Sequence, residues 1–221
     1  GSEMCIRDSG GAADPTALVA LVWGKDYVLT GFTDAGSYTS EIIFLNGNYT
    51  FAAGTGESTF TVNKKDVNIS WRGNGDGTFD WMYDGAAHAP TATADISGVN
   101  VFVVGGESAV GEYTATAVAD NGNYKLIGAT QTFKIKPYEI TVDWSGRLET
   151  GPDGIAQERF DWEFDGEHAF APEASFTDWN GNRVSLKVTG GKIYAGDYKA
   201  TAVLPENCAF APNESGTKDF K

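Results

Sequence analysis

The chain has 221 residues, and its 16 lysines and arginines are outnumbered by 30 aspartates and glutamates, which gives a formal net charge of −14. Nucleic acids and anionic membranes attract basic surfaces, so this charge argues against both as partners, while calcium and basic proteins stay open. Hydrophobic residues make up 41% of the chain and aromatic residues 13%. This suffices for small cores, yet no run reaches the roughly 20 apolar residues of a membrane span.

The first nine residues do not resemble part of a fold. The run at 3–9, Glu-Met-Cys-Ile-Arg-Asp-Ser, resembles a translated transposon-end adaptor from a sequencing library. We therefore interpret residues 1–9 as an artefact and leave them out of the fold. On this interpretation the gene is a metagenomic fragment, and its true N-terminus and any signal peptide lie outside the sequence.

One motif recurs through the rest of the chain. Gly36, Gly111 and Gly196 are each followed two residues later by a tyrosine, and then by small residues that alternate with polar ones. An asparagine follows each copy, at positions 48, 123 and 207. The glycines are 75 and 85 residues apart, and a motif at this spacing predicts tandem copies of one small domain.

The motif divides the chain into three repeats. The first repeat, residues 10–62, contains only the back half of a domain, and the second repeat, residues 63–136, is complete. The third repeat, residues 137–221, stops where its last strand would continue, so we expect a truncated C-terminus. Two or three residues, among them Pro137, separate neighbouring repeats, and so short a linker predicts stiff joints and a rod-like arrangement.

The predicted elements of each repeat are short β-strands. Tyr113, Ala115 and Ala117 alternate with threonines, which places them on one face of a strand, and the motif glycine is expected to supply unusual backbone angles before it. Alternating strands are also predicted over 67–71 and 79–83, and over 140–144 and 160–164 in the third repeat. The loop between the last two is eight residues longer than its counterpart and is predicted to lie on the surface.

Seven short strands in about 70 residues are the pattern of a β-sandwich, so the sequence predicts an all-β chain of tandem Ig-like sandwiches. Cys208 stands where the other repeats have a tyrosine, and we interpret it as a small core residue. The predicted core consists of Trp71, Trp81, Tyr83, Tyr113, Tyr124, Phe133, Trp144, Trp162, Phe164 and Tyr198.

The second repeat combines four short motifs. They are Val-x-Ile-x-Trp at 67–71, Tyr-Asp-Gly at 83–85 with His88 and Pro90 close behind, Gly-x-Tyr-x-Ala-x-Ala at 111–117, and Asn-Tyr at 123–124. This set resembles the MBG-type (YDG-type) Ig-like repeats of bacterial cell-surface proteins, and the third repeat departs from it at Phe164. The resemblance implies an extracellular repeat module in a large secreted or wall-attached protein of adhesin type, and it supplies no catalytic residue.

The two Asp-Gly turns carry the only histidines of the chain. We interpret these histidines as packing residues that the repeats share, rather than as catalytic groups or metal ligands. Zinc is not expected, because no second histidine or cysteine lies at ligand spacing. The predicted turn residues are Asp84, Gly85, His88, Asp165, Gly166 and His168.

Trp179 is the candidate for a ligand contact. It lies between Asp178 and Asn180 in a polar turn that the second repeat does not match, and an exposed tryptophan can stack on a sugar. Packing over the end of the sandwich is the other interpretation. Parts of a calcium loop occur at 74–77 and 178–182 without the closing glutamate, so calcium stays open and no other cofactor is expected.

We expect a non-catalytic structural stalk whose partners are its neighbouring repeats. Two alternatives stay open: a module that binds a glycan or a host glycoprotein, and a spacer within a secreted polysaccharide-degrading enzyme. No nucleophile elbow or phosphate-binding loop occurs in the sequence. Neither nucleic acid nor insertion into a membrane is expected.

Overall fold

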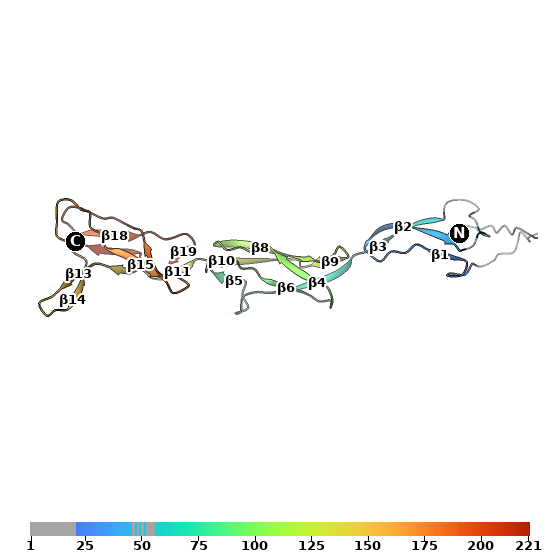
Figure 1. Cartoon of the computed structure of the whole chain (residues 1–221), viewed down its shortest axis with the longest axis horizontal. Coiled ribbons are helices and arrows are strands. Elements are labelled where there is room, and N and C mark those ends of the chain that lie inside the picture. The colour runs from blue at the N-terminus through green and yellow to red at the C-terminus, as the bar shows by residue number, and fades with distance from the viewer. Residues whose placement is uncertain (1–20, 46, 48, 50, 52–55) are drawn as a thin grey trace, which may run out of the picture. The chain divides into compact units, whose positions relative to one another are not determined.

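The computed structural model describes residues 21–45, 47, 49, 51 and 56–221. The expected artefact at 1–9 and the turn residue Asn48 lie outside the described residues. Strands make up 51% of the structure, and none of the described residues lies in a helix (Figure 1). The all-β fold predicted from the alternating patterns is therefore confirmed.

Backbone packing divides the chain into two compact units, which are described separately. Unit 1 takes its described residues from 21–70, 93–102 and 118–129, and unit 2 consists of 71–92, 103–117 and 130–221. The division runs through the second repeat rather than along the boundaries expected from the motif. The organisation into three domains stays a prediction, and the names first, second and third repeat are kept here for residues 10–62, 63–136 and 137–221.

The first and second repeats contain strands β1 to β10. The sheets have the orders β1-β2-β3, β6-β4-β9 and β5-β10-β8-β7. The second repeat has the seven strands that its sequence predicts. The bounds are Tyr27–Leu29 for β1, Gly36–Phe44 for β2, Glu57–Val62 for β3, Lys65–Arg72 for β4, Asp80–Met82 for β5, Thr91–Ala94 for β6, Val101–Val104 for β7, Gly111–Ala119 for β8, Tyr124–Ile127 for β9 and Thr130–Lys136 for β10.

The third repeat contains strands β11 to β20. Its sheets are β11-β19, β12-β15-β16, β13-β14 and β17-β18-β20. The bounds are Tyr138–Ile140 for β11, Asp143–Ser145 for β12, Arg147–Thr150 for β13, Ala156–Arg159 for β14, Glu173–Thr177 for β15, Arg183–Leu186 for β16, Val188–Thr189 for β17, Tyr198–Ala202 for β18, Cys208–Phe210 for β19 and Thr217–Phe220 for β20.

The first strand of a repeat pairs in parallel with the strand that follows the motif. Lys65 of β4 is in register with Tyr124 of β9, and Tyr138 of β11 is in register with Cys208 of β19. The turn asparagine comes one residue before β9 or β19. The pairing therefore places it beside the point where the chain enters the repeat.

The motif tyrosine folds back over the motif glycine in all three repeats. A Cβ added to Gly36, Gly111 or Gly196 would lie within 2.9, 2.8 and 2.8 Å of the tyrosine two residues later. None of these glycines has a left-handed backbone, so the ring, and not an unusual φ, requires glycine, which corrects the expectation. Each tyrosine also packs on a phenylalanine near the end of its repeat, with ring centroids 5.9, 5.6 and 5.8 Å apart for Phe60, Phe133 and Phe220.

Unit 2 contains two clusters of buried side chains. The cluster of the second repeat is built on Phe133 and Ile135, and the cluster of the third repeat on Ile140 and Phe176. The other predicted core aromatics are half-buried, except for Phe164, which is 58% exposed. Its assignment to the core is wrong, because it lies beyond the strands and no neighbouring element covers it. The half-buried set is Trp71, Trp81, Tyr83, Tyr113, Tyr124, Trp144, Trp162 and Tyr198.

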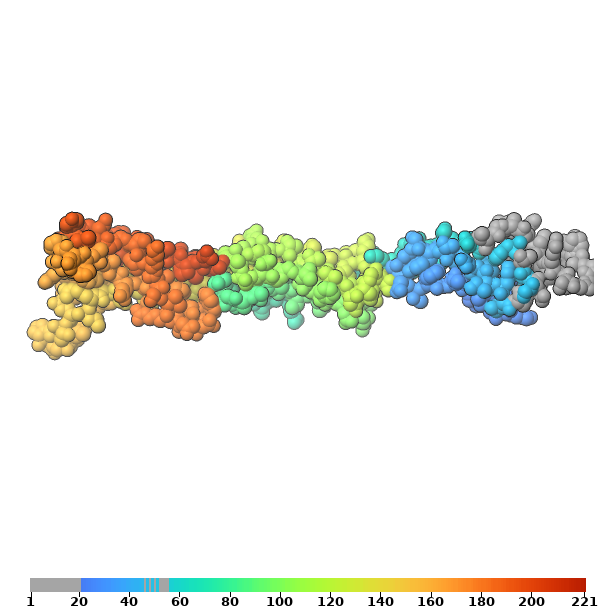
Figure 2. Space-filling view, turned by 45° about the horizontal axis from the view of Figure 1, so that its top comes forward, coloured from blue at the N-terminus to red at the C-terminus, as the bar shows by residue number. Residues whose placement is uncertain are grey.

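Three segments of the third repeat differ from their predicted form. The strand predicted over 140–144 is divided between β11 and β12, with residues 141 and 142 in neither. Residues 160–164 do not form a strand. In the second repeat, the equivalent strand β5 pairs with the three residues Lys134–Lys136. In the third repeat, Lys221 is the one described residue that bonds to the backbone of Phe160 and Trp162. The long loop before this segment forms the β13–β14 hairpin, which projects from unit 2 (Figures 1 and 2). Leu148 on the hairpin is 73% exposed.

Gly73→Ala is expected to destabilise the second repeat by about 3 kcal/mol, because backbone must move to admit the side chain. The added Cβ would lie 1.8 Å from the carbonyl oxygen of Thr78. Gly75→Ala in the same turn is the matched control, since nothing lies within 4 Å of its Cβ. Urea unfolding followed by circular dichroism measures both variants, and equal unfolding midpoints would contradict the close approach at Gly73.

Candidate functional site

The asparagine after the motif connects two repeats. The Asn207 carbonyl accepts a hydrogen bond from the N–H of Tyr138, at 3.0 Å, where the third repeat begins. Its side-chain oxygen accepts the N–H of Val110, at 2.9 Å, from the second repeat. Asn207 has a left-handed backbone with φ 59°, a conformation that asparagine tolerates better than most residues.

Asn123 repeats this arrangement within unit 1. Its carbonyl accepts the N–H of Lys65 at 2.8 Å, and its side-chain oxygen accepts the N–H of Ala35 at 2.7 Å. Its amide nitrogen also donates to the Asp34 carboxylate at 2.8 Å. Ala35 and Val110 both directly precede a motif glycine, so equivalent atoms make equivalent bonds. We call these contacts the first joint, at Asn123, and the second joint, at Asn207.

An aromatic contact adds to the second joint. Trp179, in the turn after β15, meets Tyr83 and Tyr138 edge to face, with ring centroids 5.0 and 5.7 Å apart. A Cβ on Gly85 would come within 3.2 Å of the tryptophan ring. Trp179 of the third repeat therefore covers the Asp-Gly turn of the second.

The contacts of Trp179 correspond to packing over the end of a repeat, although 37% of the residue stays exposed. Its polar neighbours hold their own turn. The Asp178 carboxylate accepts the backbone N–H groups of Asn182 and Asn180, and these bonds, the one from Asn182 first, lower the pKa of Asp178. The predicted ligand residues thus lie together, and the Asp178 carboxylate is engaged within the loop.

From the sequence, the asparagines at 123 and 207 are predicted only as turn residues. Their bonding partners lie 88 and 97 residues away, a distance at which residue patterns carry no pairing information. The available signal is the recurrence of asparagine itself in all three copies, while the residue after it changes from tyrosine to cysteine.

Each Asp-Gly turn pairs its aspartate with a histidine. His88 Nε2 lies 2.8 Å from Asp84, and His168 Nδ1 lies 2.7 Å from Asp165. Asp84 also accepts the N–H of Ala86, and this backbone bond, followed by the bond to His88, lowers its pKa. The predicted turn residues are therefore brought together in both repeats.

The two histidines are nevertheless not equivalent, which corrects the expectation of a shared role. His88 bridges to Glu107 and stacks on Trp81. Phe170, and not His168, takes that place in the third repeat, where it bridges to Lys192 and stacks on the equivalent tryptophan. The third repeat has one residue fewer between its Asp-Gly turn and its histidine, so His168 stays in the turn, with 70% of its side chain exposed.

No cluster of three or more His, Cys, Asp or Glu side chains that could hold a metal ion occurs among the described residues. At the calcium-like run 74–77, the Asp76 carboxylate accepts the backbone N–H and the hydroxyl of Thr78. These bonds lower the pKa of Asp76. The turn therefore uses this carboxylate internally.

An open groove recurs at the same place in the second and third repeats. Its volume is about 650 Å³ in the second and about 710 Å³ in the third. A phenylalanine before the Asp-Gly turn and the motif tyrosine line both copies. Their charged groups are paired, Lys134 with Glu112 at 2.9 Å and Lys221 with Asp197 at 3.1 Å.

Cys208 is half-buried in β19 and packs against the core cluster of the third repeat. Burial raises the pKa of its thiol, which keeps the thiol protonated and weakly nucleophilic. Its contacts are those of the small core residue predicted from the sequence.

Comparison of the chain with protein-family models, curated proteins and solved structures finds no match. The resemblance to MBG-type repeats therefore rests on the motifs described above. Within the part of the chain that the structure describes, no helix is long and apolar enough to cross a membrane.

The carboxyl group of Asp165 is expected to titrate with a pKa of about 2 instead of 3.8, because the N–H groups of His168 and Glu167 and the ring of His168 donate to it. The folded-state pKa lies below the unfolded value, so the turn is stabilised in full above roughly pH 4 and loses that stabilisation as the pH falls toward 2. Carboxyl ¹³C NMR follows the titration, and Asp165→Asn identifies the signal. A titration midpoint near pH 3.8 for Asp165 would contradict this prediction.

Trp179→Ala is expected to weaken the contact between the second and third repeats, because the edge-to-face pair with Tyr83 is lost. A double-mutant cycle with Tyr83→Ala should give a coupling free energy of about 0.5–1.5 kcal/mol in urea unfolding. The same cycle for Trp179 and Phe102, an exposed ring outside unit 2, is the control and should give none. Additive effects for Trp179 and Tyr83 would show that the pair contributes nothing.

Proposed function

We propose that this chain is a non-catalytic structural stalk, made of tandem Ig-like β-sandwich repeats, in a large secreted or wall-attached bacterial surface protein of adhesin type. The all-β fold and the recurrent motif agree with this proposal. The resemblance to MBG-type repeats supplies the extracellular location and the bacterial origin. Its main partners are its own neighbouring repeats.

The observation that carries the proposal is the pair of equivalent joints. Asn123 and Asn207 each accept one hydrogen bond from the first strand of their own repeat and another from the residue just before the motif strand of the preceding repeat. A spacer that only tethers two domains needs no such bond, since a disordered linker achieves the same reach. Bonds across each joint hold the direction of one repeat relative to the next, which is what a stalk requires.

One observation favours binding as the second candidate. The open groove recurs in two repeats with similar volume and aromatic lining, and sugars stack on exposed aromatic rings. Its charged groups already pair with one another, so the groove offers a glycan or host glycoprotein fewer free partners. A spacer within a polysaccharide-degrading enzyme would use the same joints, and a sequence across the neighbouring gene region distinguishes it from a surface stalk.

The experiment that tests the stalk is Asn207→Gly. Glycine keeps the left-handed backbone without strain and removes only the side-chain amide. Hydrogen exchange at the Val110 amide should accelerate about tenfold, as expected when one hydrogen bond of about 1.4 kcal/mol is lost. Within unit 2, residual dipolar couplings should give one alignment tensor for the second-repeat and third-repeat residues in the native chain and two in the variant.

Asn213→Gly is the matched control, because Asn213 also has a left-handed backbone, with φ 70°, and makes none of the joint bonds. It should leave the Val110 amide and the shared tensor unchanged. Separate alignment tensors for the two repeats in the native chain would refute the proposal of a stalk. Saturable binding of the native chain on a glycan array, abolished by Phe160→Ala in the groove, would replace it with the binding function.

A further inference from the structure

The end of the second repeat that contacts the third is a defined face. It presents the ring of Tyr83, the Gly85 turn and the N–H of Val110, and the third repeat covers all three. The third repeat has the same face at Phe164, Gly166 and Ala195. The two repeats also match in structure. A Cβ added to Gly105 would meet the carbonyl of Thr114, and a Cβ added to Gly190 would meet the carbonyl of Lys199, which is the same position of the motif strand.

The equivalent face of the third repeat is uncovered. Val110 and Gly111 are half-buried in the second joint, whereas Ala195 and Gly196 are exposed. No acceptor for the Ala195 N–H occurs in the described part of the chain. The donor that each joint uses is therefore present and unoccupied here.

The uncovered face also carries two large exposed aromatic rings. Phe164 and Tyr194 are 58% and 75% exposed and stack on each other with ring centroids 6.3 Å apart. The two rings line a shallow hollow together with Trp162, Phe170 and Ile193. Large exposed apolar groups that adjoin one another mark contact surfaces in soluble proteins.

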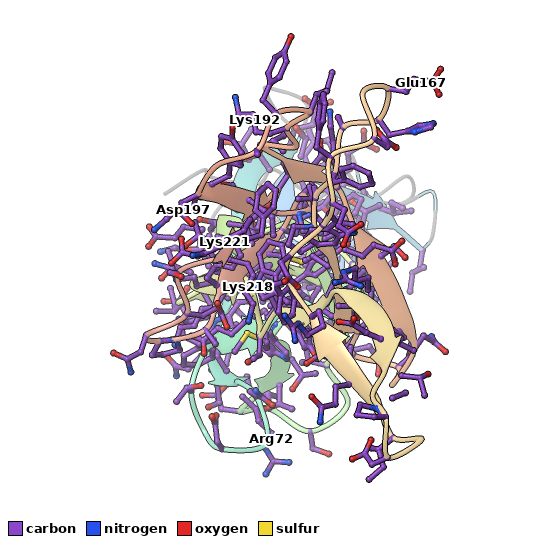
Figure 3. All side chains as sticks on the ribbon, turned by 90° about the vertical axis from the view of Figure 1, so that its left-hand side faces the viewer. Arg72, Glu167, Lys192, Asp197, Lys218 and Lys221 are labelled. Atoms are coloured by element: carbon purple, nitrogen blue, oxygen red, sulfur yellow. The ribbon has the colours of Figure 1, made fainter. Side chains whose placement is uncertain are left out.

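Charged groups lie at the edge of this face, and two of them, Lys192 and Lys221, also line the hollow. Figure 3 looks toward this end of unit 2, with Lys192, Asp197 and Lys221 on one side and Glu167 projecting on the other. Lys221 pairs with Asp197 at 3.1 Å, and the Lys192 ammonium lies 6.0 Å from the Tyr198 ring. A charged rim around an apolar centre is the anatomy of a protein interface.

We propose that this face is the docking surface for a further repeat of the same type, joined covalently after the third. The Ala195 N–H donates to the side-chain oxygen of that repeat's turn asparagine, and the turn beside it covers Phe164 and Tyr194. The inference rests on the proposed function. Its basis is continuity: Ala35 and Val110 already make this bond in two successive joints, and Ala195 is the third residue of the series.

The test is an extended chain in which Ile-Lys, the pair found at 135–136, and a second copy of residues 137–221 follow Lys221. This keeps the spacing between repeats, because Lys221 bonds to Phe160 as Lys134 bonds to Phe79. Hydrogen exchange at the Ala195 amide, followed by NMR, should slow at least tenfold relative to the 221-residue chain. Asn207→Gly in the added copy should restore the original rate.

Unchanged exchange at Ala195 beside a folded added repeat would overturn the inference. If the added copy does not fold, residues 64–136 replace it after the same Ile-Lys pair, because Lys64 corresponds to Pro137 and this segment carries Asn123. Protection of Ala195 that grows with the concentration of the unextended chain would assign the face to contacts between separate chains and also overturn the covalent arrangement. Hydrogen exchange at the Val110 amide, measured in the same samples, reports on the second joint. A failure of the stalk proposal can therefore be distinguished from a failure of this inference.

Discussion

A tyrosine ring lying on a glycine two residues earlier is the contact on which the rest of each repeat depends. The ring leaves no room for a Cβ at Gly36, Gly111 or Gly196. In the first two repeats its hydroxyl donates to a carbonyl four residues upstream, at Asp34 and Ala109, at 3.0 Å in both. A tyrosine corner of this kind is known from β-sandwiches, where it fixes the path of the chain into a strand. Here it fixes the residue just before the glycine.

That residue is the donor of the joint. Because the tyrosine holds the backbone before the glycine, the N–H of Ala35 or Val110 points out of its repeat toward the turn asparagine of the next. The asparagine is held in turn by its own carbonyl, which accepts from the first strand of its repeat. Donor and acceptor are each oriented by the fold of a single repeat before the two meet. The joint therefore costs little additional ordering, since few groups must be immobilised to form it.

The alternation of polar and apolar residues was sufficient to predict the strands of the second repeat, but it also predicted a strand over 160–164 that the third repeat does not form. Ala115 and Ala117 are buried as the period of two requires, and β4 follows its predicted alternation. Features that depend on groups far apart in the chain could not be predicted in this way. At the second joint Trp179 packs against Tyr83 from 96 residues away, whereas Phe164, the equivalent of Tyr83, has no such partner and is exposed. One residue fewer in a turn was enough to replace His88 by Phe170 at an equivalent place.

The parallel pairing of the first strand has a mechanical consequence. In the second and third repeats, β4 and β11 begin at the joint and run in parallel with β9 and β19. Tension applied where the chain enters such a repeat acts along the strand, so the hydrogen bonds of the ladder share the load in shear. An antiparallel hairpin pulled from its open end instead unzips one bond at a time. A repeat built in this way resists extension until the whole ladder ruptures, and it then yields in a single step.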